Sequence, residues 1–190
     1  MESRRTGVCI WFTGQSGGGK STITRALVPR LEDLGLTVSV LDVVPLLRKR
    51  WFEKTSEGKL LRKAYVASQI VTHGGVAIAV TVSARALVRE EARLMVGPDR
   101  FVEVRVAPPP EVAAERKAAR PKKPKLSKRL RRLARSVLSL LPGRGEGAAD
   151  PGRAPDLEID SALVPPEVAA DQILGLLADR GLIPSPDARA

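Results

Sequence analysis

A glycine-rich stretch near the beginning of the chain has the residue types and the spacing of a phosphate-binding loop. Positions 14–21 read GQSGGGKS, which satisfies the pattern G-x-x-x-x-G-K-[S/T]. Glycines let the backbone curl so that several N–H groups point at one anion. The ammonium of Lys20 can then reach the outer phosphates, and the hydroxyl of Ser21 can bind Mg²⁺. The pattern predicts that the chain binds a nucleoside triphosphate.

The segments that flank this stretch are those that a phosphate-binding loop needs. An apolar run over Val8–Thr13 indicates a β-strand before it, and the pattern over 20–34 indicates a helix after it. The N-terminal end of that helix would add its partial positive charge to the anion site. A glycine-rich turn with a purely structural role is the alternative, but such a turn has no need of a strand and a helix at these two places.

Strand and helix patterns alternate along the rest of the chain. Further strands are predicted over 37–41, 76–82, 101–106 and 157–159, and helices over 45–52, 57–72, 84–95, 109–120 and 166–180. This alternation predicts a three-layer α/β/α fold of P-loop NTPase type, in which the central layer is a mostly parallel five-stranded sheet. Residues 1–183 would form this single domain, and residues 184–190 a loose tail.

Ligands of such sheets bind beyond the carboxyl ends of the strands. Thr13, Asp42, Ser83 and Ala107 are predicted to lie at those ends. Asp42 could simply cap the turn that follows its strand, or it could act on a bound phosphate. We favour the second interpretation, because this edge is where α/β sheets place their catalytic groups.

Composition limits the class of protein. The chain has 190 residues, of which 43% are apolar, and this is enough for one folded domain with a core. Its one cysteine, Cys9, excludes a disulfide framework. The sequence contains neither a signal-peptide pattern nor an apolar run long enough to span a membrane. We therefore expect a cytoplasmic location.

The net charge of +11 comes from one segment of the chain. Residues 116–135 contain 11 lysines and arginines and no acidic residue, so the remainder is neutral. We interpret 117–141 as a basic helical insertion or lid, and 142–156 as a flexible connector. Three interpretations of the basic helix stay open: a solvated face whose leucine stripe packs on the domain, a lid over phosphates, or a contact with membrane or nucleic acid. The third is the least favoured, because residues 116–145 contain no aromatic side chain.

Beyond the glycine-rich stretch, the sequence resembles the adenylylsulfate (APS) kinases. Residues 10–22 (IWFTGQSGGGKST) are similar to that family's W-x-T-G-L-S-G-S/A-G-K-S-T motif, and Val40-Leu41-Asp42 to the start of its L-D-G-D-N motif. A third similarity is to the family's F-x-E-V…P-x-E-V…E-R stretch. It is carried by Phe101-Val102-Glu103-Val104, Glu111-Val112 and Glu115-Arg116. The resemblance spans about residues 7–180, with a gap at 117–154.

The resemblance implies a kinase that transfers the γ-phosphoryl group of ATP to the 3′-hydroxyl of APS with the help of Mg²⁺. It implies that Lys20 and Asp42 are catalytic, that Ser21 and Asp42 hold the metal, and that Arg116 and Arg120 close over ATP. The implied nucleotide-binding residues are Gly14, Gln15, Ser16, Gly17, Gly18, Gly19, Lys20, Ser21, Thr22, Arg116 and Arg120.

The acceptor side departs from the family pattern. The second carboxylate of L-D-G-D-N is Val44 here, the asparagine is Pro45, and the arginine that usually follows is Leu47. The residues that could still bind an acceptor are Arg48, Trp51, Arg62, Ser83 and Arg85.

Two hypotheses follow from an intact ATP side and a rewritten acceptor side. The favoured one is a small-molecule kinase whose default acceptor is APS. The alternative is a nucleotide-binding module with little transfer activity, recruited to a partner or an anionic surface through residues 122–141. A homodimer is left open in both.

Overall fold

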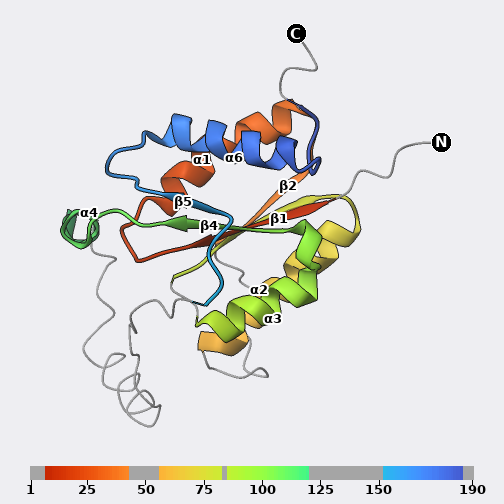
Figure 1. Ribbon diagram of the computed structural model, residues 1–190, viewed down its shortest axis with the longest axis horizontal. Helices are drawn as coiled ribbons and strands as arrows, with labels where there is room; N and C mark the ends of the chain where they lie inside the picture. The colour runs from red at the N-terminus through yellow and green to blue at the C-terminus, as the bar shows by residue number, and fades with distance from the viewer. Residues whose placement is uncertain (1–6, 43–55, 83–84, 120–151, 186–190) are drawn as a thin grey trace, which may run out of the picture.

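A computed structural model of the chain describes residues 7–42, 56–82, 85–119 and 152–185. A central sheet lies between two layers of helices, with α1 and α6 on one face and α2 and α3 on the other (Figure 1). In chain order the elements are β1 (Val8–Thr13), α1 (Lys20–Asp33), β2 (Val38–Leu41), α2 (Ser56–Thr72), β3 (Val76–Val80), α3 (Ala86–Val96), the 3₁₀ turn η2 (Pro98–Arg100), β4 (Phe101–Val106), α4 (Pro110–Ala119), β5 (Leu157–Ile159) and α6 (Pro166–Asp179).

The five strands are all parallel and lie in the order β2-β3-β1-β4-β5. β1 occupies the centre, where Val8 pairs with Val76 of β3 and Cys9 pairs with Phe101 of β4. Because helices cover both faces, the central strands are almost entirely apolar. The predicted three-layer α/β/α fold with a mostly parallel five-stranded sheet is thereby confirmed, and every strand pair is in fact parallel.

Alternate residues of β1 contribute to two separate cores, as the two-residue period of a strand requires. Val8, Ile10 and Phe12 pack beneath α1 and α6, and all three are fully buried. Cys9 and Trp11 face α2 and α3, where the Trp11 ring lies 5.5 Å from that of Phe101. The two cores fix the strand that carries the glycine-rich loop on both of its faces.

The element boundaries differ from the predicted ones by a few residues. β3 ends at Val80 and not at residue 82, and the next residue, Thr81, turns its hydroxyl to the carbonyl of Phe12. α3 begins at Ala86, two residues later than predicted. Gly35 adopts a positive φ of 74° after α1, as expected for a helix stop. Several predicted segments lie outside the described residues. They are the helix over 45–52, the basic segment 120–141, residues 142–151 of the connector and most of the C-terminal tail.

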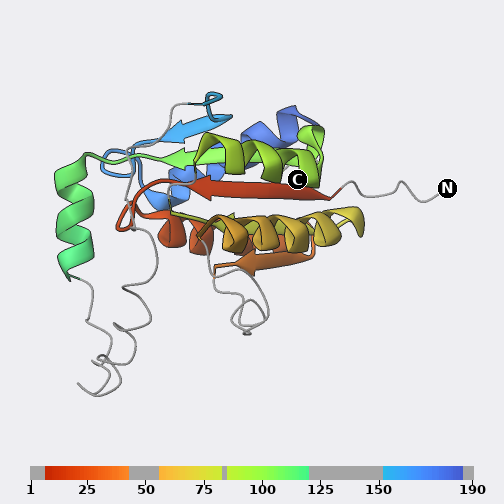
Figure 2. The same cartoon turned by 90° about the horizontal axis from the view of Figure 1, so that it is seen from below.

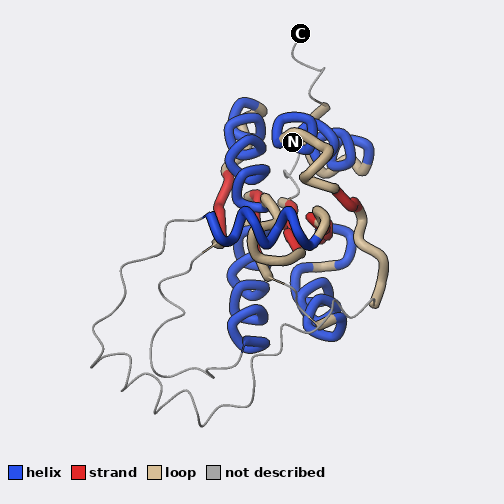
Figure 3. The backbone as a smooth tube through the Cα atoms, turned by 90° about the vertical axis from the view of Figure 1, so that its left-hand side faces the viewer, coloured by secondary structure: helices blue, strands red, loops and turns tan. Residues whose placement is uncertain are grey.

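α4 is set apart from the three layers. The strands point their carboxyl ends toward it, and it stands across that edge of the sheet (Figures 2 and 3). The ends of β1, β4 and β5 therefore face α4, and any ligand at this edge would lie beside it. Within the described part of the chain, no helix has the length and apolar character needed to cross a membrane.

Candidate nucleotide site

The loop between β1 and α1 has a backbone that only glycine adopts without strain. Gly14, Gly17 and Gly19 have φ angles of 124°, 94° and 91°. A Cβ on Gly14 would lie 2.1 Å from the carbonyl oxygen of Val106, and one on Gly17 would lie 2.3 Å from that of Ala113. The loop is thus pressed against the end of β4 and against α4, and side chains at these positions are excluded.

Lys20 brings a cation to this loop from the first residue of α1. The residue is only 6% exposed, and its Nζ donates to the carbonyl oxygens of Gly14 and Gln15, at 2.7 Å each. Gly19 precedes the helix in a left-handed conformation, so the N-terminal turn that contains Ser21 and Thr22 opens directly from the loop. A buried lysine ammonium and the start of a helix therefore meet at this loop, and Ser21 lies in the first turn of that helix.

A second group of contacts reaches the loop from the turn after β5 and from α4, at the same carboxyl edge of the sheet. The hydroxyl of Ser161, two residues after β5, donates to the carbonyl of Gly18 at 2.9 Å. Arg116 of α4 donates to the Ser161 hydroxyl at 3.0 Å and to its carbonyl at 3.1 Å. Arg116, which the family resemblance assigns to the nucleotide, thus lies beside the glycine-rich loop. Ser161 was not predicted, and the only signal for it is its position just beyond the carboxyl end of a strand.

Asp42 follows β2 at the same edge of the sheet, and its side chain is exposed. Its backbone carbonyl accepts a hydrogen bond from Lys63 of α2 at 3.2 Å, and the same ammonium donates to the carbonyl of Val80 at 2.6 Å. Lys63 was also not predicted. Its signal in the sequence is a lysine on the otherwise apolar face of a helix, next to Ala64 and four residues before Ala67.

The predicted acceptor residues are only partly described. Arg62 is half-buried on α2, and the exposed Arg85, just before α3, pairs with Glu57 of α2 at 3.1 Å. Helices that follow parallel strands begin at the carboxyl edge, so this ion pair lies on the same side of the sheet as the loop. The other predicted site residues lie outside the described part of the chain: Arg48, Trp51, Ser83 and Arg120.

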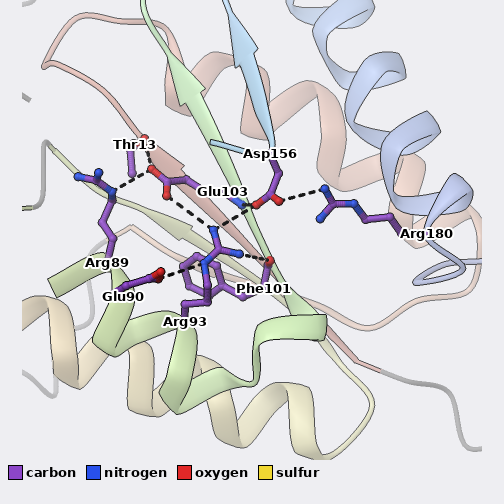
Figure 4. Close-up of polar contacts among 8 residues, drawn as sticks. All are labelled: Thr13, Arg89, Glu90, Arg93, Phe101, Glu103, Asp156 and Arg180. Carbon is purple, nitrogen blue, oxygen red and sulfur yellow. Dashed lines mark hydrogen bonds and ion pairs between the residues drawn. The ribbon is translucent and has the colours of Figure 1, made fainter. Parts of the chain in front are cut away.

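A buried set of charges holds the base of the loop (Figure 4). Glu103 of β4 is 2% exposed, and its carboxylate accepts a hydrogen bond from the Thr13 hydroxyl at 3.2 Å and pairs with Arg89 of α3 at 3.1 Å. Thr13 is the residue immediately before Gly14. The carboxylate therefore ties the last residue of β1 to α3, and its burial is compensated by the guanidinium. Burial raises the pKa of Glu103, and Arg89 and the Thr13 hydroxyl oppose that rise.

Asp156 extends this set of charges to β5 and α6. Its carboxylate accepts the backbone N–H of Glu103 at 2.7 Å and pairs with Arg93 at 3.3 Å and Arg180 at 3.0 Å. Burial by itself would raise the pKa of Asp156, but the Glu103 N–H bond and the two guanidinium groups outweigh it, so the pKa lies below its usual range. Arg93 also covers the ring of Phe101, with its Cζ 4.8 Å from the ring centroid.

The residues present fit a nucleoside triphosphate with Mg²⁺. The left-handed glycines form a concave run of backbone in which a Cβ has no room, and Lys20 and Arg116 place two cations beside it. In the described part of the chain, no three His, Cys, Asp or Glu side chains cluster to hold a metal. Mg²⁺ does not need such a cluster, because it is commonly bound by one or two protein oxygens, by water and by the substrate's phosphates. Ser21 and Asp42 offer oxygens of this kind.

Comparison with known proteins gives a consistent result. Residues 6–123 match the family described as adenylylsulphate kinase. An adenylyl-sulfate kinase from Synechococcus sp. (strain JA-3-3Ab) is 34% identical over 117 residues, which cover 59% of this chain and 65% of that protein. The chain thus spans slightly under two thirds of that relative. A probable adenylyl-sulfate kinase from Pyrococcus abyssi is 28% identical over 184 residues, 94% of this chain and 99% of that protein.

Among solved structures, the chain is similar to the Mycobacterium tuberculosis APS kinase CysC in complex with AMPPNP and APS. The TM-score is 0.66 at 23% identity, with 91% of this chain and 98% of that chain covered. At this level of identity the likeness establishes a shared fold.

Substitution of Gly17 tests whether the loop backbone forms the anion site. Gly17→Ala places a Cβ against the carbonyl of Ala113 at a φ of 94°, which costs on the order of 1–3 kcal/mol in strain alone. We expect the Kd for ATP to rise about 10-fold or more, as measured by calorimetry. Gly175→Ala in α6, where a Cβ meets nothing within 4 Å, is the control and should bind ATP as the wild type does. Equal affinities for the two variants would contradict the role assigned to the loop.

Acid titration tests the buried charges. Because the pKa of Asp156 is lowered in the fold, its charge stabilises the protein above the usual aspartate pKa of about 3.9, and this contribution is lost as the pH falls further. We expect Asp156→Asn to lower the free energy of unfolding by about 3–5 kcal/mol at pH 7, in urea titrations, and the deficit to shrink in acid. Glu103, whose pKa is shifted in the opposite direction, is present in both proteins. The difference in the free energy of unfolding between wild type and variant therefore reports on Asp156.

Asp171→Asn serves as the matched control for this titration. Asp171 pairs with Arg30 at the surface, where 66% of its side chain is exposed, so its loss should cost no more than about 1 kcal/mol. A deficit for Asp156→Asn as small as that of the control would show that the buried charges do not support the fold.

Proposed function

Because the chain belongs to the adenylylsulphate kinase family, we propose that it is an ATP- and Mg²⁺-dependent kinase that phosphorylates a hydroxyl group of a small molecule. APS is the default acceptor, since relatives that match the chain are named adenylyl-sulfate kinases. The observation that carries the proposal is the loop itself. Three left-handed glycines, the buried Lys20 and the Arg116–Ser161 contact surround one short stretch of backbone.

The chain's own residues would act mainly by binding and neutralising phosphates. The N–H groups of the loop and of the first turn of α1 would bind the phosphate oxygens. Lys20 would exchange its two carbonyl acceptors for the β- and γ-phosphates, a change of partner that keeps the ammonium in place. Ser21 and Asp42 would hold Mg²⁺, which would offset the negative charge of the phosphates during transfer. Transfer then depends on alignment of the two substrates.

Arg116 is proposed to close the nucleotide side. Its guanidinium is exposed and already bonded to Ser161 beside the loop, so a small movement of α4 would bring it over the phosphates. Arg120, together with residues 117–141, would extend this lid.

The acceptor would bind on the opposite side of the loop, near Asp42. Asp42 is proposed to receive the proton of the acceptor's hydroxyl. The residues proposed to contact the acceptor are Arg48, Trp51, Arg62, Ser83 and Arg85. Val44, Pro45 and Leu47 replace three polar positions of the family pattern. An acceptor other than APS, or slow transfer to APS, is therefore part of the proposal.

The alternative function is nucleotide binding with little transfer, coupled to recruitment through the basic segment. The run of cations in residues 116–135 supports it, because a concentrated positive charge attracts anionic surfaces. A cytoplasmic location is proposed for either function, and a homodimer stays open for both. One protein of similar structure, from Thiobacillus denitrificans, is a hexameric APS kinase.

A coupled assay of ADP release, run with APS and with a panel of other hydroxyl compounds, tests the kinase proposal. We expect acceptor-dependent turnover in the wild type and a fall of at least about 100-fold in kcat for Lys20→Ala, since that cation stabilises charge that develops in transfer. Lys59→Ala, an exposed lysine of α2, should keep the wild-type rate. Tight ATP binding with no acceptor-dependent turnover would reject the kinase and favour the binding module.

A further inference from the structure

Lys63 places a charge on the buried face of α2. Its neighbour Ala64 and Ala67, one turn later, are fully buried against the sheet, and Lys63 itself is only 8% exposed. Burial of an ammonium without hydrogen-bond acceptors is strongly unfavourable. An apolar residue would fill such a position more easily, so the acceptors that Lys63 contacts have to account for it.

Those acceptors are backbone carbonyls at the ends of two neighbouring strands. Lys63 Nζ donates to Val80 at 2.6 Å and to Asp42 at 3.2 Å. The last paired residues of β2 and β3 are Leu41 and Ala79, so both carbonyls come one residue after the strand ladder ends. The ammonium replaces the next rung of that ladder and joins the two strand ends. Burial lowers the pKa of Lys63, and the negative charge of Asp42 opposes this.

The contacts continue from β3 to β1. The residue after Val80 is Thr81, whose N–H and hydroxyl both donate to the carbonyl of Phe12, at 3.0 Å and 2.7 Å. Phe12 precedes Gly14 by two positions in β1. An uninterrupted series of hydrogen bonds and short chain segments therefore connects Asp42, at the edge of the sheet, with the start of the glycine-rich loop at its centre.

We infer that Lys63 is a positioning residue that sets the place of Asp42 relative to the phosphate-binding loop. This inference rests on the proposed function, in which Asp42 meets the metal or the acceptor hydroxyl. Lys63 holds the backbone of Asp42 and not its carboxylate, so the side chain is kept at the carboxyl edge and stays exposed for a substrate. Lys63 acts on the reaction only through Asp42.

The test compares Lys63→Met, which keeps the length of the side chain and removes its donors, with Lys59→Met on the exposed face of the same helix. We expect Lys63→Met to lower kcat by about 10- to 100-fold, as a displacement of about 1 Å of a reacting group can do. The Kd for ATP should change by less than about 2-fold, because the loop itself is untouched. Lys63→Arg should recover part of kcat, because a guanidinium can donate to two carbonyls.

A double-mutant cycle separates positioning from general destabilisation. If Lys63 acts through Asp42, the kcat of the Asp42→Ala, Lys63→Met double variant should equal that of Asp42→Ala, because the second change has nothing left to misplace. A wild-type kcat for Lys63→Met, or independent losses that multiply in the double variant, would overturn the inference.

Hydrogen exchange keeps this test distinct from that of the kinase itself. In Lys63→Met, amides of Asp42 and Thr81 should exchange faster than in Lys59→Met, while those of Gly14–Gly19 should be unchanged. If the wild type shows no transfer, the proposed function fails and the exchange data alone decide whether Lys63 holds the strand ends. Unchanged exchange at Asp42 and Thr81 would overturn the Lys63 inference even in an active enzyme. Should Lys63→Met not fold, Lys63→Arg is examined in the same two measurements.

Discussion

The loop after β1 is pressed so closely against its neighbours that its backbone, and not its side chains, forms the surface. A side chain on Gly14 would collide with the carbonyl of Val106 at the end of β4, one on Gly17 with the carbonyl of Ala113 in α4, and one on Gly19 would crowd the hydroxyl of Ser161. These three neighbours belong to three different parts of the fold. They fix the left-handed curl of the loop, and that curl points N–H groups toward one place where an anion can bind. The positions of α4 and of the turn after β5 therefore follow from the same constraint.

Buried charges support this arrangement from below and from the side. Under the loop, Glu103 and Asp156 connect β1, β4 and α6 with two arginines of α3. At the side, Lys63 joins the carbonyls that end β2 and β3. Charges in such positions are tolerated because each has partners at hydrogen-bonding distance, and removal of one partner leaves the other uncompensated. They are directional, unlike apolar packing, and so can hold strand ends at set distances.

The two sides of the site have different relations to the adenylylsulphate kinase family to which the chain belongs. On the proposed nucleotide side, Lys20, Ser21 and Arg116 match the family's motifs, and the glycine-rich loop packs tightly against its neighbours. On the proposed acceptor side, the family's polar pattern is interrupted by Val44, Pro45 and Leu47. Lys63 adds a buried cation there that does not belong to any of the recognised sequence motifs. If the proposed assignment holds, a retained phosphate site beside a changed acceptor side is what a shift of acceptor would require, because the phosphate chemistry is common to all acceptors.

Local patterns in the sequence determined the elements of the fold and the identity of the loop. The apolar run of β1, the glycine spacing and the helix that follows depend on neighbours a few residues away, and β4 and β5 have the predicted bounds. The parallel sheet also follows, because alternating strands and helices leave few other arrangements. The resemblance seen in these motifs is confirmed by the family match over residues 6–123.

The tertiary structure alone decided which distant residues meet at the site. Ser161 and Gly18 are 143 positions apart in sequence, and Thr13 and Glu103 are 90 apart. No spacing rule connects such pairs, since their contact depends on strand order, register and the direction in which each helix crosses the sheet. Lys63 shows the same limit. The helical period places it on the buried face of α2, but only the alignment of two strand ends supplies the carbonyls that make a buried cation stable there.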